Sequence, residues 1–438
     1  MQYIPNILFL IILVLGVGYF TLNIKKLIRN IKLGRAVDAS DNKSERWRNM
    51  ARIALGQSKM VKRPVAGFLH IVVYVGFIII NIEVLEIIID GLFGTHRIGL
   101  KVLPESVYGF LIGSFEVLAV LVLVSVIVFW IRRNVVKLKR FLSSEMKGWP
   151  KSDGNIILYF EVVLMCLFLV MNATDTTFQN LGHGNVISQF IAPWFSSLSE
   201  GTLHIIERTA WWIHIAGILV FLNYLYFSKH LHILLAFPNT YFGSVQPKGK
   251  FNNLEAVTNE VKLMMDPNAD PFAAAPEGAE EEEPAKFGAS DVMDLNQIQL
   301  LNAYTCTECG RCTSACPANL TGKKLSPRKI MMDTRDRLEE VGKNIDANGG
   351  EFKDDGKQLL GDYITNEELW ACTTCNACVE ECPVSINPLS IILEMRRYLV
   401  MEQSAAPMEL NNMMTNIENN GAPWPYNQMD RLNWANEE

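Results

Sequence analysis

The sequence lacks the excess of positive charge that nucleic-acid-binding proteins carry. It has 40 lysines and arginines against 46 aspartates and glutamates, which gives a formal net charge of −6 over 438 residues. We therefore expect no nucleic-acid partner. No arrangement of side chains suggests a nucleophile or a hydrolytic triad.

Cysteine is scarce until the last third of the chain. Only Cys166 of the nine cysteines precedes residue 306, and its apolar surroundings predict a small core residue. The other eight form two copies of the pattern Cys-x-x-Cys-x-x-Cys-x-x-x-Cys-Pro. They are Cys306, Cys309, Cys312 and Cys316 before Pro317, and Cys372, Cys375, Cys378 and Cys382 before Pro383.

This doubled pattern is a ligand set for two [4Fe–4S] clusters. Three thiolates of each loop bind one cluster, and the fourth cysteine of the run binds the other cluster. Disulfides would need an oxidising compartment, and zinc sites favour two well-separated Cys-x-x-Cys pairs. The predicted ligands are Cys306, Cys309, Cys312 and Cys382 for cluster 1, and Cys372, Cys375, Cys378 and Cys316 for cluster 2.

The first 240 or so residues contain five apolar stretches long enough to span a bilayer. The first stretch lacks a basic start and a small-residue cleavage site, so we predict a retained helix and not a signal peptide. Basic residues gather in the loops after the first and third stretches, whereas the other two loops carry only Arg97 and Lys101. This asymmetry predicts an outside N-terminus and a cytoplasmic cluster domain. The stretches cover roughly 4–24, 65–90, 106–131, 155–172 and 207–235.

Histidines inside these stretches suggest haem. His70 lies just inside the second stretch, while His214 and His232 are 18 residues apart in the fifth. On one continuous helix that spacing is five turns, or about 27 Å along one face. Imidazoles held inside a helical bundle are the usual axial ligands of haem b. We predict one haem between His70 and His232, with His230 rotated away from it.

His214 has no obvious second ligand for an outer haem, because position 80 is an isoleucine. Three alternatives stay open. A histidine from an outer loop could complete the site, the haem could have one protein ligand, or the haem could be absent. The outer-loop histidines are His96, His183 and His204.

Acidic residues also occur within the predicted spans. Glu83, Glu86 and Asp90 share one face of the second span, and Glu116 and Glu161 lie in the third and fourth. Carboxyls at such depth suggest proton transfer beside a quinone. The alternative is a hydrated stripe near the membrane interface. Glu83 and Glu86 are therefore the candidate proton carriers.

The chain divides into four parts. A transmembrane domain (1–245) precedes a linker (246–293) that contains the acidic run 280–283 and Pro284. A helical cluster domain (294–402) and an aromatic tail (403–438) follow. We expect the tail to dock a partner chain, or alternatively to fold back on the cluster domain. Helices are predicted from near Asp294 and over 327–341, 366–371 and 388–402, and the tail aromatics include Trp424, Tyr426 and Trp434.

Four segments resemble known proteins. The segments CTECGRCTSACPANLTGKKLSPRK and LWACTTCNACVEECPVSINPLSIILEMRRYLVM resemble heterodisulfide-reductase-like iron–sulfur oxidoreductases. RPVAGFLH and WWIHIAGILVFLNYLYFSKHLHILLAFPNTYF are similar to the gamma-subunit cytochrome b of respiratory nitrate reductase. The resemblance extends to electron-transfer-flavoprotein:menaquinone oxidoreductases. Fused members of that family continue into CCG domains, so the resemblance implies a separate CCG-domain iron–sulfur partner.

The expected fold is all-α, a five-helix transmembrane cytochrome b-type bundle followed by a helical di-[4Fe–4S] domain. The expected function is that of a quinone-linked oxidoreductase subunit in the bacterial cytoplasmic membrane. It would pass electrons between a cytoplasmic iron–sulfur protein or electron transfer flavoprotein and menaquinone. The alternative direction oxidises quinol and feeds a heterodisulfide or sulfur-compound reductase. A redox sensor without turnover is a third hypothesis, and it needs no chain of haem and clusters.

Overall fold

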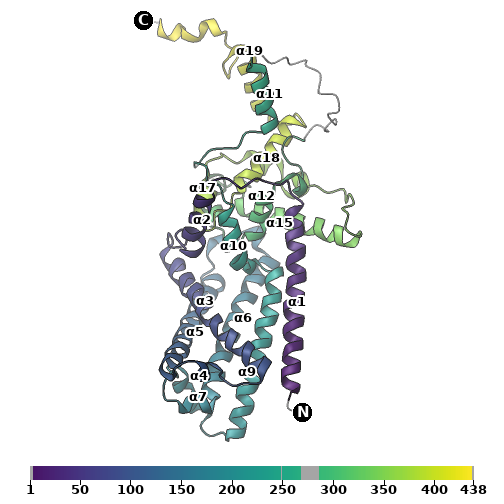
Figure 1. Ribbon diagram of the computed structural model, residues 1–438. Coiled ribbons are helices and arrows are strands. Elements are labelled where there is room, and N and C mark those ends of the chain that lie inside the picture. The colour runs from purple at the N-terminus through teal and green to yellow at the C-terminus, as the bar shows by residue number, and fades with distance from the viewer. Residues whose placement is uncertain (1–2, 248, 268–285, 437–438) are drawn as a thin grey trace.

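The computed structural model describes residues 3–247, 249–267 and 286–436. Regular structure in these ranges is helical, apart from two isolated bridges between single residues (Figure 1). The predicted all-α class is therefore confirmed. The acidic run 280–283 and Pro284 lie outside the described residues.

Five helices are long and apolar enough to cross a membrane. Helix α1 packs on α3 and α9, α5 packs on α3 and α6, and α6 packs on α9. Small residues allow close crossings, because a Cβ built on Gly76 of α3 would lie 2.4 Å from Val122 of α5. The five helices are α1 (Ile4–Lys32), α3 (Pro64–Phe93), α5 (Glu105–Asn134), α6 (Trp149–Thr174) and α9 (Glu200–Tyr224).

We predicted that the fifth span continues to residue 235. In the structure it does not continue as one helix. Helix α9 ends at Tyr224, and two short 3₁₀ turns follow before α10 (His232–Tyr241). Ser228 is extended, and its hydroxyl accepts a hydrogen bond from the His230 N–H (3.1 Å). Buried Asp153 of α6 accepts hydrogen bonds from the Tyr224 hydroxyl (2.6 Å) and the Lys229 N–H (3.2 Å). These bonds stabilise the break, so the five-turn spacing of His214 and His232 is wrong.

The helices predicted around the cysteine loops are confirmed. Asn296 caps α12, and Ser326 caps α15 by accepting from the Lys329 N–H (3.4 Å). Side-chain caps satisfy N–H groups that the first helical turn leaves unpaired. The helices of this part are α12 (Gln297–Thr305), α13 (Arg311–Ala315), α14 (Pro317–Leu320), α15 (Pro327–Ala347), α16 (Asn366–Trp370), α17 (Ala377–Glu381) and α18 (Pro388–Met401).

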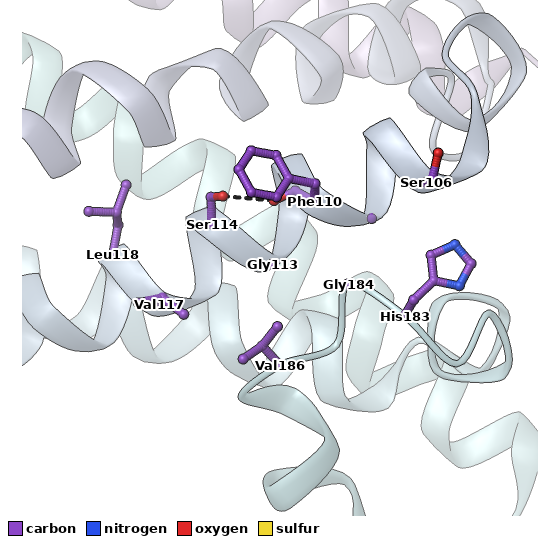
Figure 2. Close-up of a pocket in the computed structure, with 10 residues that line it drawn as sticks. Ser106, Phe110, Gly113, Ser114, Val117, Leu118, His183, Gly184 and Val186 are labelled. Atoms are coloured by element: carbon purple, nitrogen blue, oxygen red, sulfur yellow. Dashed lines mark hydrogen bonds between the residues drawn. The ribbon is translucent and has the colours of Figure 1, made fainter.

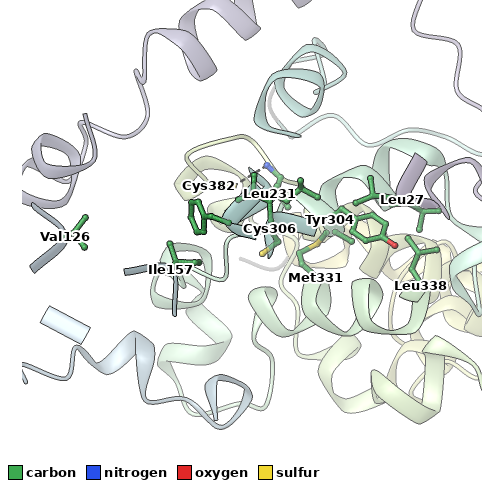
Figure 3. Packing of buried hydrophobic residues seen from close by; sticks show 14 of the residues in the cluster. Leu27, Val126, Ile157, Leu231, Tyr304, Cys306, Met331, Leu338 and Cys382 are labelled. Carbon is green, nitrogen blue, oxygen red and sulfur yellow. Dashed lines mark hydrogen bonds between the residues drawn. The ribbon is translucent and has the colours of Figure 1, made fainter. Parts of the chain in front are cut away.

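The cluster domain lies on one end of the bundle, here called the cluster end, opposite the distal end (Figure 1). One apolar core runs from the bundle into this domain, and Figure 3 shows Leu231 beside Cys306 and Cys382. Polar contacts cross the same junction. The fully buried Arg328 pairs with Glu145 at 2.6 Å.

Peripheral helices complete the structure. The described part of the tail has no buried residue, and Trp424, Tyr426 and Trp434 are 56%, 64% and 73% exposed. These aromatic residues therefore do not fold back into the cluster domain. The remaining helices are α2 (Lys43–Met50), α4 (Gly99–Val102), α7 (Thr176–Asn180), α8 (Ser188–Ile191), α11 (Glu255–Met265) and α19 (Met408–Asn420).

Candidate electron-transfer site

The two cysteine loops face each other through α13 and α17. Cys382 lies near enough to Cys306 and Cys312 for their charges to interact, although it belongs to the second run. Cys316 of the first run interacts in the same way with Cys372 and Cys378. The structure thus brings together the two crossed groups that the sequence predicts, and the ligand assignment itself stays a prediction.

Both loops adopt the same backbone conformation. Glu308 and Gly310 have positive φ in the first loop, and Thr374 and Asn376 have positive φ at the matching positions of the second. Such residues reverse the chain within a few positions. At Gly310 a side chain is also excluded, because a Cβ would lie 2.5 Å from Nη1 of Arg328.

The chemistry of these thiols fits an iron–sulfur group. All nine cysteines are free thiols, and one small cavity is lined by Cys306, Cys309, Cys312 and Cys382, together with Cys378 of the other predicted group. Burial raises the pKa of Cys306 to about 12 and that of Cys382 to about 11. Thiols that are so hard to ionise become thiolates when a bound metal supplies the positive charge.

His70 and His232 face each other at the cluster end. Their ring centres are 6.5 Å apart and their planes differ by 45°. An imidazole nitrogen lies about 2 Å from a metal that it binds, so two imidazoles on opposite sides of one metal have centres roughly 6 Å apart. His232 donates from Nδ1 to the Lys229 carbonyl (3.1 Å), and Nδ1 of His70 is buried without a partner. The Nε2 atom of His232 therefore remains available to a metal.

His230 is a neighbour of this pair. Its ring centre lies 5.5 Å from that of His232 and 5.3 Å from that of Phe221. Its Nε2 atom is 4.0 Å from Glu161, and the side chain is only 15% exposed. The histidine therefore packs inside the bundle and not at a water interface.

Lys229 joins the histidine segment to the first cysteine loop. Its carbonyl accepts from His232, and its ammonium pairs with Glu308, which lies between Cys306 and Cys309. Arg335 of α15 pairs with the same carboxylate at 2.8 Å. Burial raises the pKa of Glu308, but the two cations outweigh burial and the net shift is downward. The sequence did not predict this link, although charged residues beside a predicted ligand cysteine and a predicted ligand histidine were the available signal.

His214 and the outer-loop histidines have different neighbours. It is 4% exposed, its Nδ1 atom has no partner, and its ring centre lies 6.3 Å from that of Phe168. His96 pairs with Asp175, His183 hydrogen-bonds to the Leu181 carbonyl, and His204 is exposed. The three alternatives for an outer haem stay open.

The carboxyl groups at the distal end have two kinds of environment. Glu86 accepts hydrogen bonds from the Gly99 N–H (2.9 Å) and the Tyr108 hydroxyl (3.1 Å). Glu116 accepts from Asn172 and from two N–H groups of the 187–188 loop. Glu83 is also buried, but its Oε2 atom has no partner. Burial of Glu83 and Asp90 rules out the hydrated stripe for these two residues.

A groove of about 770 Å³ opens between α5 and the 183–186 loop at the distal end (Figure 2). Most of its lining is carbon, with Ser106 and His183 toward one end and Leu118 toward the other. A Cβ on Gly109 would lie 2.5 Å from the His183 ring, so this glycine allows the loop to approach.

Comparison with known proteins agrees with this geometry. The family of 4Fe-4S dicluster domains matches residues 305–386. The iron-sulfur-binding oxidoreductase FadF of Bacillus subtilis is 30% identical over 461 residues, covering 98% of this chain and 61% of that protein. Over almost its whole length, the chain is thus similar to a protein named as an iron–sulfur-binding oxidoreductase.

Other known oxidoreductases match as well. EtfAB:quinone oxidoreductase of Syntrophomonas wolfei is 27% identical, over 88% of this chain and 53% of that protein. One polypeptide of a CoB-CoM heterodisulfide reductase from Methanosarcina acetivorans is 34% identical, over 27% of this chain and 60% of that polypeptide. The chain thus spans 61% and 53% of the first two relatives. No solved structure matches.

Proposed function

We propose that this chain is the membrane subunit of a respiratory oxidoreductase. It would carry electrons between a cytoplasmic iron–sulfur or flavoprotein partner and menaquinone. The observation that supports this most strongly is the direct junction of the first cysteine group with the His70/His232 pair through Lys229 and Glu308. Two [4Fe–4S] clusters and haem b would supply the one-electron carriers at these residues.

The chain's own residues hold and insulate these positions. Lys229 fixes the tautomer of His232 through its carbonyl and fixes the cysteine loop through its ammonium. Leu231 and Met331 fill the apolar core around Cys306 and exclude water (Figure 3). A fixed and dry environment keeps the cost of reorganisation low when charge moves.

The proposed setting is the bacterial cytoplasmic membrane, with the N-terminus outside and the cluster domain in the cytoplasm. The asymmetry of lysine and arginine among the loops supports this orientation. Free thiols throughout the chain agree with a reducing compartment.

The proposed partners are a CCG-domain iron–sulfur protein and electron transfer flavoprotein. The name of the Syntrophomonas wolfei relative includes EtfAB and quinone. The exposed tail, with Trp424, Tyr426 and Trp434, offers the aromatic contact area that protein interfaces favour. We propose that a partner docks on this tail.

The reverse direction is the second candidate. Quinol would be oxidised in the membrane, and electrons would leave toward a heterodisulfide or sulfur-compound reductase. The match of the cluster domain to the Methanosarcina acetivorans heterodisulfide reductase favours this direction. The same residues serve both directions, so the identity of the partner and the reduction potentials would separate them.

Glu83 is the better of the two candidate proton carriers for quinone chemistry. Glu86 is occupied by two hydrogen bonds that hold the distal loop, whereas one oxygen of Glu83 is unpartnered. We propose that the quinone ring enters the groove of Figure 2, because the groove adjoins the loop that Glu116 holds. A quinone in this groove would need a second electron carrier, a haem at His214, because His70 and His232 lie at the other end of the bundle.

The decisive experiment is an optical and EPR redox titration of the purified protein, with iron and haem counted per chain. Eight non-haem irons and low-spin haem b, with clusters and haem both reducible by a menaquinol analogue, are the expected result. Iron–sulfur signals without haem would overturn the proposed path to quinone.

Two variants locate the haem. His70→Ala should remove the low-spin haem at the cluster end, whereas His214→Ala should leave it in place. Loss of a second haem in His214→Ala would place a carrier near the groove. An unchanged haem content in His70→Ala would contradict the His70/His232 assignment.

A further inference from the structure

Arg311 lies in the spacer between Cys309 and Cys312 and points from the cysteine loop to the bundle. It is the first residue of α13 and only 4% exposed. Its guanidinium donates to the carbonyls of Lys59 (3.3 Å) and Met60 (3.5 Å) and lies 2.9 Å from the Met60 sulfur. All three acceptors are neutral.

Two neighbouring cations at the junction are paired with carboxylates instead. Arg63 pairs with Glu381 at 3.1 Å, and Lys62 pairs with Glu380 at 2.6 Å. In the described part of the chain, no carboxylate oxygen lies within ion-pair distance of Arg311. Arg311 lines the small cavity that Cys306, Cys309, Cys312 and Cys382 also line. A cluster held by these thiolates would therefore lie beside its guanidinium.

Arg311 also reaches the turn that carries His70. The Met60 carbonyl that it holds touches the first turn of α3, where a Cβ on Gly67 would lie only 2.7 Å from that oxygen. His70 follows three residues later on the same helix. One side chain thus connects the cysteine loop to the histidine pair.

We propose that Arg311 is the buried counter-charge of the first cysteine group, raises the reduction potential there, and fixes that group against the His70 turn. Arg311 is a positioning residue that acts through the thiolates and Met60. The inference rests on the proposed function only in taking this group as the one that exchanges electrons with the bundle.

The physical basis is electrostatic. Four thiolates give the bound group a negative charge, and hydrogen bonds, burial and net charge set the potential of such groups. A buried cation without its own carboxylate stabilises the more negative, reduced state. Removal of the cation therefore shifts the equilibrium toward the oxidised state.

Arg396 supplies a matched comparison at the second cysteine group. It donates to the carbonyls of Leu369 (2.6 Å) and Cys372 (2.6 Å), and it lies over the Trp370 ring. Arg396 comes from α18 and not from the cysteine loop, but like Arg311 it donates to neutral acceptors beside its cysteine group. Substitution of either arginine should therefore shift the reduction potential of only the cysteine group beside it.

The test is an EPR redox titration of the full-length protein with Arg311→Gln and Arg396→Gln. We expect Arg311→Gln to disfavour reduction of the first group by about tenfold, which is about 59 mV for a one-electron couple. The second group should stay at its wild-type potential. Arg396→Gln should give the opposite pattern.

A conservative variant separates charge from structure. Arg311→Lys keeps the cation and should return the potential close to the wild-type value, even if Arg311→Gln fails to retain its iron. An assembled Arg311→Gln protein with an unchanged first potential would overturn the inference. So would an Arg311→Lys protein shifted as far as Arg311→Gln. Neither result depends on haem or quinone, so failure here is distinguishable from failure of the proposed function.

Discussion

At the scale of single residues, neighbouring side chains of one type have different roles in this protein. Glu83 and Glu86 lie one turn apart on α3, yet only Glu86 is fully engaged in hydrogen bonds. Cys316 and Cys382 end their own runs, yet each lies among the cysteines of the other run. Contacts, and not residue type, assign these roles.

Substitution of the two glutamates should therefore give different results. Glu83→Gln should lower menaquinone-linked turnover by on the order of a hundredfold, because it removes a proton carrier, and should leave stability unchanged. Glu86→Gln should lower the thermal unfolding temperature, because it weakens the bonds to Gly99 and Tyr108. Turnover and unfolding of both variants provide the measurement, and equal turnover in Glu83→Gln and wild type would contradict a proton role.

Serine substitutions test the crossed cysteine groups. Cys382→Ser should alter the EPR signal of the group that Cys306, Cys309 and Cys312 hold. Cys316→Ser should alter the other signal. Cys166→Ser is the control and should change neither, because Cys166 is exposed on α6. The prediction that Cys166 is a core residue is therefore wrong. If Cys316→Ser and Cys382→Ser each alter the EPR signal of the cluster held by the other three cysteines of the same run, the crossed ligand assignment is wrong.

At the scale of elements, the junction depends on a broken helix. The chain leaves the α-helical path after Tyr224, and this places Lys229 between α6, the first cysteine loop and the His232 ring. The break therefore positions the histidine pair and the cluster domain together.

Glu308 is the centre of that junction. Glu308→Gln leaves Lys229 and Arg335, 9% and 17% exposed, without their shared carboxylate. Loss of one partner of a buried ion pair costs about 3–5 kcal/mol, so the iron–sulfur absorbance should be lost at a lower temperature. Glu367→Gln is the control, because its pair with Lys324 is exposed and contributes little. If iron–sulfur absorbance is lost at the same temperature in both variants, the role of Glu308 is contradicted.

Helix α15 introduces a pH dependence. Burial raises the pKa of Asp333 to about 6. Lys329 opposes this shift only in part, because its ammonium is shared between Asp333 and Glu368. The folded protein then binds the proton more tightly than the unfolded chain. The stabilising contribution is complete below about pH 4 and is lost as the pH rises through about 6. Denaturation of the cluster domain at several pH values should show this fall, and Asp333→Asn should abolish it.

At the scale of the whole molecule, the cluster domain is held by packing and not only by its linker. Its core is continuous with that of the bundle, and Arg328 of α15 pairs with Glu145 where both are buried. The exposed pair of Lys62 and Glu380 adds a contact that salt can screen. The two parts should therefore behave as one body.

Cleavage of the linker tests this conclusion. A protease site placed in the acidic run 280–283 should allow complete cutting without release of the cluster domain from membranes. High salt should weaken the exposed pairs but leave the domain bound. The measurement is the share of iron that remains with the membrane pellet, and release at low salt would show that the linker alone retains the domain.

Local features of this protein can be predicted from its sequence alone. The cysteine spacing, the five apolar spans and the capped helices follow from short-range chemistry, because each depends on residues only a few positions apart. The tertiary structure alone decided the end of α9 at Tyr224, the pair of Lys229 with Glu308 and the contact of Arg311 with Met60. Arg311 and Met60 are 251 residues apart in the chain. No local pattern encodes such a contact, because it forms only when the cluster domain packs on the bundle and removes both groups from water.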